Sequence, residues 1–325
     1  MSSLVNVAIH PSQFPEKVRR DLLESLRTRE VNHKFHYDSV KQTQKWLELH
    51  QAHSPSRNDA DCAAIYDASF AAAAGRIVSK SVHLIGIGCG GGQKDSRLLK
   101  LLKRCVKEIS YTPCDVSAAM VLTARRAAVE VLPEEHYFPV VCDLAGADDL
   151  PAIFDQRTTH HATRLTTFFG MIPNFEPEMI LPKLASLVGG EDWLLFSANL
   201  APGNDYEAGV KTVLPQYDNP LTRDWLLAFL LDLGVEMGDG DLRFTIEDVN
   251  GLKRIVARFH FVRSRTIAVE AERFEFRADE SIRLFFSYRY MPELARRVLE
   301  QHGLTIVDQW ITKSEEEGVF LCCRR

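Results

Sequence analysis

The sequence predicts an α/β fold with a doubly wound, mainly parallel sheet. One observation is a glycine-rich turn, residues 86–92, which lies between an apolar run from Val82 and a charged, leucine-rich stretch from Lys94 to Glu108. Another is that strand and helix patterns alternate through residues 63–200. Such alternation is typical of parallel sheets with right-handed crossovers. Ligands of these sheets bind beyond the carboxyl ends of the strands.

The glycine-rich turn is the first candidate ligand site. Gly86, Gly88 and Gly90 follow or end the apolar strand pattern. Glycine lets the backbone adopt conformations that a Cβ forbids, and it lets a ligand approach closely. One interpretation is a nucleotide-like cofactor over these three glycines. The other is a purely structural turn between strand and helix.

Two further strand patterns carry an aspartate near their carboxyl ends. Asp115 lies in the pattern from Glu108 to Val116, and Asp143 lies in the pattern from Phe138 to Leu144. A carboxylate at such a position can accept hydrogen bonds from both hydroxyls of a ribose. A second carboxylate suits an exocyclic adenine amine. The pair favours S-adenosylmethionine (SAM) over NAD, because the turn does not continue into the pattern typical of pyrophosphate binding.

Composition narrows the functional classes. The chain has 325 residues, of which 46% are hydrophobic and 26% charged, so it can form one large domain or two smaller ones. A formal net charge of −5 provides no broad basic surface, which disfavours nucleic acid as a partner. No run approaches the ~20 apolar residues of a membrane span, and no signal-peptide pattern is present. We therefore expect a cytoplasmic protein whose partner is neither nucleic acid nor a membrane.

The sequence predicts no metal site. None of the seven cysteines forms a C-x-x-C pair, which favours buried thiols in a reducing compartment over disulfides or zinc. The adjacent His160 and His161 have no further ligand at metal-binding spacing, so we expect them in a solvated loop.

The α/β pattern is interrupted between residues 201 and 286. This stretch contains a helical pattern over residues 220–233 and two alternating segments, 254–264 and 266–277, which we expect to pair antiparallel in a separate lobe. The α/β pattern resumes after Ser287 and ends in two strands, 304–312 and 318–323. Their hairpin-length connection makes the last strand antiparallel. A parallel sheet closed by one antiparallel hairpin is the shape of class I methyltransferases.

The chain resembles the histidine-specific, SAM-dependent Nα-methyltransferases of ergothioneine biosynthesis, whose fungal relatives methylate a prenylated tryptophan. The resemblance covers nearly the whole chain and rests on the order and spacing of several motifs. These motifs are Lys34 to Asp38, Ser54 to Arg57, Gly88 to Gly90 with Lys94 and Arg97 to Leu99, Tyr111 to Ser117, Cys142 to Leu144, Phe169 to Pro177, Gln216 to Asp218, Arg254 with Ile255, and Ser287 to Tyr290.

The resemblance implies a domain organisation and a set of site residues. Residues 63–200 and 287–325 would form a SAM-binding domain with the class I Rossmann-like sheet, and residues 1–62 and 201–286 an α+β substrate-binding domain. The implied cofactor contacts are Gly88, Lys94, Asp115 and Asp143. The groups implied to hold the amino and carboxylate groups of an amino acid are Tyr37, Asn174 and Tyr217, with Asn174 and Tyr37 as catalytic residues.

The chain departs from the family at the side-chain pocket. Histidine-using members usually have a tyrosine where Ser54 stands, a methionine at about Ala257, and a glutamate at Phe285, two residues before Ser287. The glutamate and tyrosine hold the imidazole. Without them, buried imidazole nitrogens would stay unpaired at about 1–3 kcal/mol each. We therefore expect N-methylation of an amino acid or derivative with a larger or more apolar side chain than histidine.

Two alternatives remain from the residues alone. One is an NAD-dependent oxidoreductase on a similar sheet, and the other is a non-catalytic relative that binds a ligand or a partner protein. Without the family match, Asn174 is a turn asparagine after Pro173, and Tyr37 and Tyr217 are half-buried packing residues.

Overall fold

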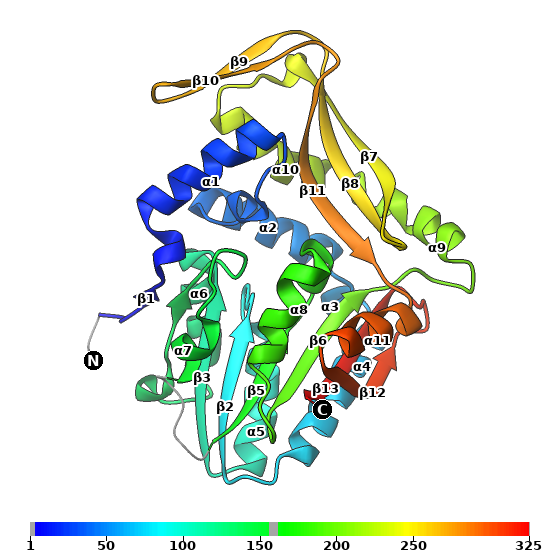
Figure 1. Ribbon diagram of the computed structural model, residues 1–325. Helices are drawn as coiled ribbons and strands as arrows, with labels where there is room; N and C mark the ends of the chain where they lie inside the picture. Colours follow the sequence, from blue (N-terminus) through cyan, green and yellow to red (C-terminus); the bar gives the residue numbers. More distant parts are fainter. Residues whose placement is uncertain (1–3, 156–161, 325) are drawn as a thin grey trace. The chain divides into compact units, whose positions relative to one another are not determined.

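The computed structural model describes residues 4–155 and 162–324, and the chain forms two compact units. Unit 1 consists of Met1–Gln13, Pro55–Leu200 and Tyr290–Arg325, and unit 2 consists of Phe14–Ser54 and Ala201–Arg289. Figure 1 gives the labels of their elements. The pair His160 and His161 lies outside the described residues.

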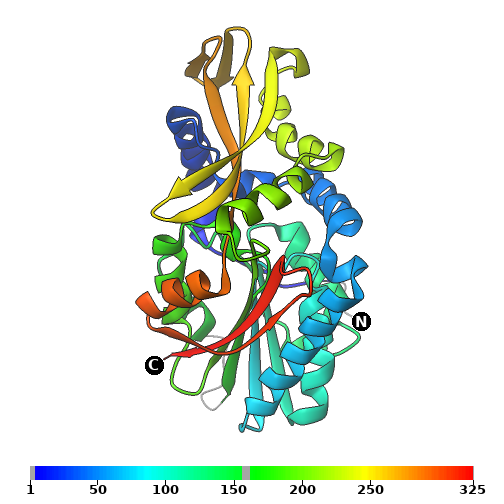
Figure 2. The ribbon, with the colours of Figure 1, turned by 90° about the vertical axis from the view of Figure 1, so that its right-hand side faces the viewer.

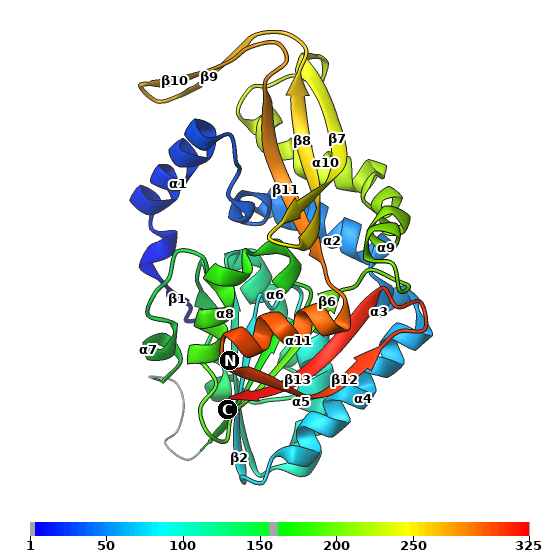
Figure 3. The same ribbon diagram turned by 45° about the vertical axis from the view of Figure 1, so that its right-hand side comes forward.

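Unit 1 is built on one sheet with the strand order β1-β4-β3-β2-β5-β6-β13-β12. Every pair is parallel except that β13 runs antiparallel to both β6 and β12. Figure 3 shows β12 and β13 side by side in this sheet. The predicted fold class, a parallel sheet closed by an antiparallel hairpin, is therefore confirmed. In chain order the strands are β1 (Ala8–Ile9), β2 (Ser81–Ile87), β3 (Glu108–Asp115), β4 (Val140–Val141), β5 (Thr163–Phe168), β6 (Trp193–Asn199), β12 (Leu304–Ile311) and β13 (Glu317–Arg324).

Helices cover both faces of this sheet (Figure 2). In α5, Leu98, Leu99 and Leu102 are fully buried while Lys100 and Lys103 are exposed, which is the spacing of an amphipathic helix. The α-helices of unit 1 are α3 (Pro55–Asn58), α4 (Ala60–Arg76), α5 (Gln93–Cys105), α6 (Ala118–Ala128), α7 (Leu150–Asp155), α8 (Pro177–Ser186) and α11 (Pro292–Gln301), with 3-10 turns η1 (Pro11–Gln13), η3 (Glu134–His136) and η4 (Ile172–Asn174).

Unit 2 combines helices with antiparallel strands. Its sheet has the order β11-β8-β7, and β9 pairs with β10 in a separate hairpin. The elements are α1 (Pro15–Thr28), η2 (His33–His36), α2 (Val40–His53), α9 (Tyr206–Val213), η5 (Leu214–Tyr217), α10 (Pro220–Asp232), η6 (Met237–Asp239), β7 (Gly240–Val249), β8 (Leu252–Phe261), β9 (Arg265–Val269), β10 (Glu272–Phe276) and β11 (Ser281–Arg289).

The expected pairing of residues 254–264 with 266–277 is wrong. Glu270 takes a positive φ of 52°, which allows β9 and β10 to turn back on each other. β8 instead pairs with β7 on one side and β11 on the other. A sequence signal for the β7–β8 hairpin was present, because Asn250 and Gly251 form the type of two-residue turn in which both φ angles are positive.

The N-terminal part of the chain also differs from expectation. The strand expected over residues 138–144 is only Val140–Val141, because Pro139 has no N–H to donate to a ladder. Ala8–Ile9 pairs with this short strand, so residues 8–13 belong to unit 1 instead of a separate domain. Unit 1 resumes at Pro55, earlier than the expected residue 63, because α4 packs on α5 and β13.

No helix in the described ranges is long and apolar enough to span a membrane.

Replacing Gly92 with alanine should destabilise unit 1. Gly92 caps α5 with a φ of 70°, and a Cβ there would lie 2.6 Å from the Ala124 Cα on α6. Left-handed strain and overpacking together predict a loss of about 2–4 kcal/mol in the free energy of unfolding. Denaturant titration measures this loss. Gly190→Ala is the control, because a Cβ there meets nothing within 4 Å. Equal stability of the two variants would contradict the packing described.

Candidate functional site

The glycine turn after β2 is held by close contacts with three neighbours. A Cβ on Gly88, whose φ is 62°, would lie 2.6 Å from the Met171 Cγ. A Cβ on Gly86 would lie 2.1 Å from Asp95 Oδ2. Gly92 meets α6 in the same way. Protein groups therefore fill the Cβ positions of Gly86, Gly88 and Gly92. At residue 86, which the sequence analysis expected to face the cofactor, that group is Asp95.

Asp95 is a buried carboxylate that the sequence analysis did not single out. Its Oδ2 accepts a hydrogen bond from the Tyr111 hydroxyl at 2.7 Å, and its Oδ1 accepts one from Thr167 at 2.8 Å. Burial raises the pKa of Asp95 to about 6, against the lowering effect of these two hydrogen bonds. The side chain fixes the first turn of α5 against strands β3 and β5.

Asp115 ends β3 and is bonded directly to the glycine turn. The Gly90 N–H donates to Asp115 Oδ2 at 3.0 Å, and the Ser117 N–H donates to Oδ1 at 3.0 Å. Burial raises the pKa of Asp115 to about 6, while the backbone donors act in the opposite direction. Each carboxylate oxygen has a second lone pair, so Asp115 can accept further hydrogen bonds from two hydroxyls. The structure thus brings together Gly90 and Asp115, as the sequence predicted.

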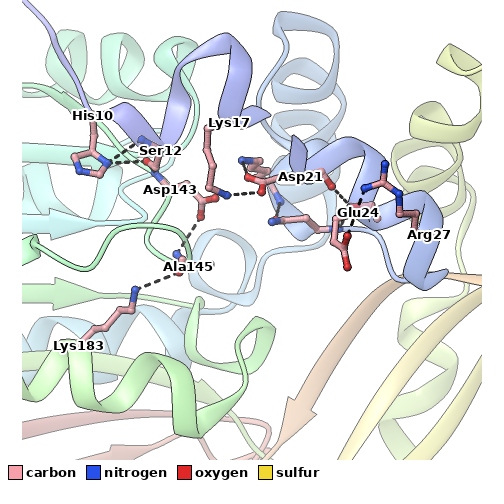
Figure 4. Close-up of polar contacts among 12 residues, drawn as sticks. His10, Ser12, Lys17, Asp21, Glu24, Arg27, Asp143, Ala145 and Lys183 are labelled. Atoms are coloured by element: carbon pink, nitrogen blue, oxygen red, sulfur yellow. Dashed lines mark hydrogen bonds and ion pairs between the residues drawn. The ribbon is translucent and has the colours of Figure 1, made fainter. Parts of the chain in front are cut away.

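Asp143 follows the short strand β4. Its Oδ1 accepts a hydrogen bond from the Ala145 N–H at 3.0 Å, and its own N–H donates to Ser12 Oγ at 2.9 Å (Figure 4). Lys183 donates to the Ala145 carbonyl at 3.1 Å and so holds the loop in place. Because β3 and β4 are parallel neighbours, Asp115 and Asp143 lie at the same edge of the sheet.

Lys94 belongs to a polar network inside unit 1. Its Nζ donates to the Tyr66 hydroxyl at 2.7 Å, and burial lowers the pKa of the Lys94 ammonium. The Tyr66 oxygen also contacts Glu317 and lies 2.8 Å from Ser197 Oγ. Ser197 in turn accepts a hydrogen bond from the Gly170 N–H at 2.9 Å. The network therefore joins α4, α5, β6 and β13 to the segment after β5.

That segment carries Asn174. Gly170 takes a φ of 70°, and η4 follows, with the Asn174 N–H donating to the Met171 carbonyl at 2.9 Å. Met171 is also the residue that lies against Gly88. The loop of the expected catalytic asparagine therefore contacts the glycine turn of the expected cofactor site.

Unit 2 brings most of its predicted site residues together. Phe285 on β11 is directly opposite Ala257 on β8, so their side chains share one face of the sheet. The Phe285 ring centroid lies 6.5 Å from that of Tyr217 and 5.6 Å from that of Trp225. The Tyr217 hydroxyl donates to Ser287 Oγ at 2.9 Å.

Aromatic contacts extend this group to Tyr37. The centroid of the Tyr37 ring lies 5.4 Å from that of Trp225 and 6.1 Å from that of Trp46. We call the set Tyr37, Trp46, Tyr217, Trp225 and Phe285 the aromatic cluster. Ser54 caps the carboxyl end of α2, the helix that carries Trp46.

The sequence analysis missed the two tryptophans, Tyr66 and Glu317. Trp225 is buried, and its Nε1 donates to the His36 carbonyl at 2.7 Å. No local pattern distinguishes such residues from ordinary core. Within the described ranges, no group of three or more His, Cys, Asp or Glu side chains is arranged to hold a metal ion.

Several solved structures are similar to this chain. A SAM-dependent methyltransferase from Clostridium acetobutylicum ATCC 824 is 12% identical, with 86% of this chain and 98% of that chain covered and a TM-score of 0.47. Magnesium protoporphyrin IX methyltransferase from Synechocystis PCC 6803, solved with bound S-adenosylhomocysteine (SAH), is 13% identical, with 89% and 97% covered and a TM-score of 0.45. The CcbJ methyltransferase from Streptomyces caelestis is 12% identical, with 80% and 96% covered and a TM-score of 0.41.

No curated relative matches the chain. A family model described as histidine-specific, SAM-dependent methyltransferase matches residues 18–324, nearly the whole chain. The chain therefore belongs to the family of histidine-specific, SAM-dependent methyltransferases.

Proposed function

We propose that the protein is an N-methyltransferase whose acceptor is the amine of an amino acid, or of a small molecule derived from one, with a side chain larger or more apolar than histidine. The observation that carries this proposal is Phe285 in the aromatic cluster, with Ala257 directly across the strand. The family's dependence on SAM sets aside the NAD-dependent alternative.

The side chains around Phe285 argue against an imidazole. An imidazole ring has one N–H donor and one acceptor nitrogen, and both need partners when buried. Phenylalanine offers neither, and its neighbours Tyr217 and Trp225 add apolar ring surface. Residue 257 is alanine, and its small side chain supports our proposal that the acceptor carries a bulky side chain on this face of the sheet.

The residues of unit 1 fit the nucleoside part of SAM. Asp115 and Asp143 are buried carboxylates at one strand edge, and each already accepts a backbone N–H on one oxygen or both. We assign the ribose hydroxyls to Asp115 and the adenine amine to Asp143, with the backbone of Gly88 and Gly90 beside the cofactor. When bound, SAM supplies a methyl group on a positively charged sulfur.

The remaining requirements fall on this chain's own side chains. An amine attacks only as the neutral form with its lone pair aimed at the methyl carbon, so orientation matters most. We assign this role to Asn174, whose amide can accept a hydrogen bond from the amine. Tyr37 and Tyr217, with Ser287, would hold the amino and carboxylate groups of the acceptor.

Two further contacts support these assignments. Arg289 Nε donates to the Tyr217 hydroxyl at 3.1 Å, which places a positive charge beside the group proposed for the carboxylate. The network of Lys94, Tyr66 and Ser197 holds the Gly170 N–H, and with it the loop of Asn174. We also propose that Lys94 contacts the cofactor directly.

A screen of amino acids and aromatic amines for SAH release tests the proposal as a whole. Release with an aromatic amino acid or amine supports it. No release with any acceptor, despite tight SAM binding, would favour the non-catalytic alternative.

Asn174→Ala should reduce turnover about 100-fold, because misplacing a nucleophile by about 1 Å costs on that order. The dissociation constant of SAH should barely change, since Asn174 is assigned to the acceptor. Steady-state kinetics and calorimetry measure the two quantities. Turnover close to that of the wild type would remove Asn174 from the mechanism.

The affinity for SAH should fall as the pH is lowered through about 6. Burial raises the pKa of Asp115 to about 6, so its carboxylate is protonated at a higher pH than an exposed aspartate. Protonation removes acceptor capacity for the ribose, with a limit of roughly tenfold in affinity per pH unit. Calorimetry across this range measures the slope.

Asp115→Asn should bind SAH more weakly at neutral pH and show a flatter profile. Asp95, which also has its pKa raised to about 6 by burial, serves as the control, because Asp95→Asn should keep the wild-type slope. An unchanged slope in Asp115→Asn would refute the assignment of the ribose to Asp115.

Phe285→Glu should shift the preference toward histidine, most clearly when combined with Ser54→Tyr. A charge-assisted hydrogen bond to the imidazole is worth about 1.5–3 kcal/mol, or roughly 10- to 150-fold in the ratio of kcat/KM values. Phe285→Leu is the matched control, since it removes the ring without adding a carboxylate. If both variants change the ratio equally, residue 285 does not read the acceptor side chain.

A further inference from the structure

Residues 8–13 form an N-terminal segment at the edge of the unit 1 sheet that lies before the residues matched by the family model. Ala8 and Ile9 pair with β4, and the His10 N–H donates to the Val141 carbonyl at 2.9 Å. The turn η1 then carries the chain past the carboxyl end of β4. The segment therefore lies beside Asp143, at the strand edge proposed for the nucleoside.

Ser12 fixes this segment to Asp143. Its buried Oγ accepts the Asp143 N–H at 2.9 Å and lies 2.9 Å from His10 Nδ1 (Figure 4). His10 Nδ1 also accepts the Ser12 N–H at 3.1 Å, so the imidazole proton belongs on Nε2, which lies 3.0 Å from Asp149. The Asp143 N–H thus donates to Ser12, the Ser12 hydroxyl to His10, and His10 Nε2 to Asp149. Together these bonds fix the position of Ser12.

Gln13, the next residue, contacts the chain directly after β3, the strand that ends in Asp115. Its Nε2 donates to the Val116 carbonyl at 2.6 Å, directly after Asp115. Because a carbonyl only accepts, this bond fixes which end of the amide is nitrogen, and Oε1 must point elsewhere. That oxygen is buried, and no donor among the described residues reaches it. A buried acceptor without a donor costs about 1–3 kcal/mol and calls for an explanation.

We propose that Gln13 Oε1 is a third nucleoside-binding acceptor, which takes a hydrogen bond from an N–H or O–H of the bound cofactor. The inference rests on the proposed nucleoside site at Asp115 and Asp143. The exocyclic amine and the two ribose hydroxyls of a nucleoside all carry donor hydrogens. Asp115 and Asp143 therefore need not be their only acceptors. Gln13 is tied to the residue after Asp115, and its neighbour Ser12 to Asp143, so the orphan oxygen lies at this edge.

Calorimetry with SAH on the wild type and on Gln13→Met tests the proposal. Methionine keeps the length of the side chain but offers no comparable acceptor, so SAH should bind about 3- to 10-fold more weakly. Gln42→Met is the matched control: Gln42 is a buried glutamine of unit 2 whose Oε1 also has no donor among the described residues. Its substitution should leave SAH affinity unchanged.

Analogues of SAH identify the donor. If the adenine amine binds Gln13, S-inosylhomocysteine, which lacks that amine, should bind the wild type and Gln13→Met equally. If a ribose hydroxyl is the donor, the difference between the two proteins should vanish for the 2′-deoxy or the 3′-deoxy analogue instead. The side-chain amide resonances of Gln13 in 15N-labelled wild-type protein should also shift on addition of SAH.

Two outcomes separate this inference from the cofactor assignment. If the wild type binds no SAH, the proposed nucleoside site itself is wrong. If the wild type binds SAH, and Gln13→Met binds it equally well with an unmoved Gln13 amide resonance, the orphan oxygen is satisfied by water and the inference is overturned.

Discussion

The close approach of three neighbours to the glycines around the end of β2 is the constraint on which the geometry of the glycine turn in unit 1 depends. Asp95 lies against Gly86, Met171 against Gly88, and α6 against Gly92. Each contact brings a functional or structural element to the same turn, and the Gly90 N–H then binds Asp115. A side chain at these positions would displace the loop of Asn174, the first turn of α5 or the helix behind it.

Local patterns in the sequence were sufficient for the fold class and for expecting Gly90 and Asp115 in the same part of the sheet, although not for the hydrogen bond between them. The antiparallel closing hairpin also followed from the short connection between β12 and β13. Long-range contacts carry no such signal: Tyr66 and Glu317 meet across most of the chain, and Gln13 meets Val116. The sequence likewise does not show that Asp95 occupies the Cβ position beside Gly86.

Phe285 and Ala257, which we propose to contact the acceptor side chain, lie on one face of the unit 2 sheet. The register between β8 and β11 sets Phe285 opposite Ala257, and Tyr217 and Trp225 pack around the phenyl ring. In this chain, which belongs to a family described as histidine-specific, the residue that we propose to contact the acceptor side chain, Phe285, has no carboxylate to pair with an imidazole. The sequence analysis did not identify Trp225 and Trp46. A single tryptophan in a helix pattern cannot be distinguished from an ordinary core residue unless the rings that it contacts are known.

The most direct test of this account is a competition between acceptors in the unaltered protein. Histidine and an aromatic amino acid such as tryptophan or phenylalanine would be mixed in equal amounts with SAM, and the methylated products quantified by mass spectrometry. The ratio of products gives the ratio of kcat/KM values. The account predicts that the aromatic acceptor dominates. Efficient methylation of histidine in preference to every aromatic acceptor would contradict it.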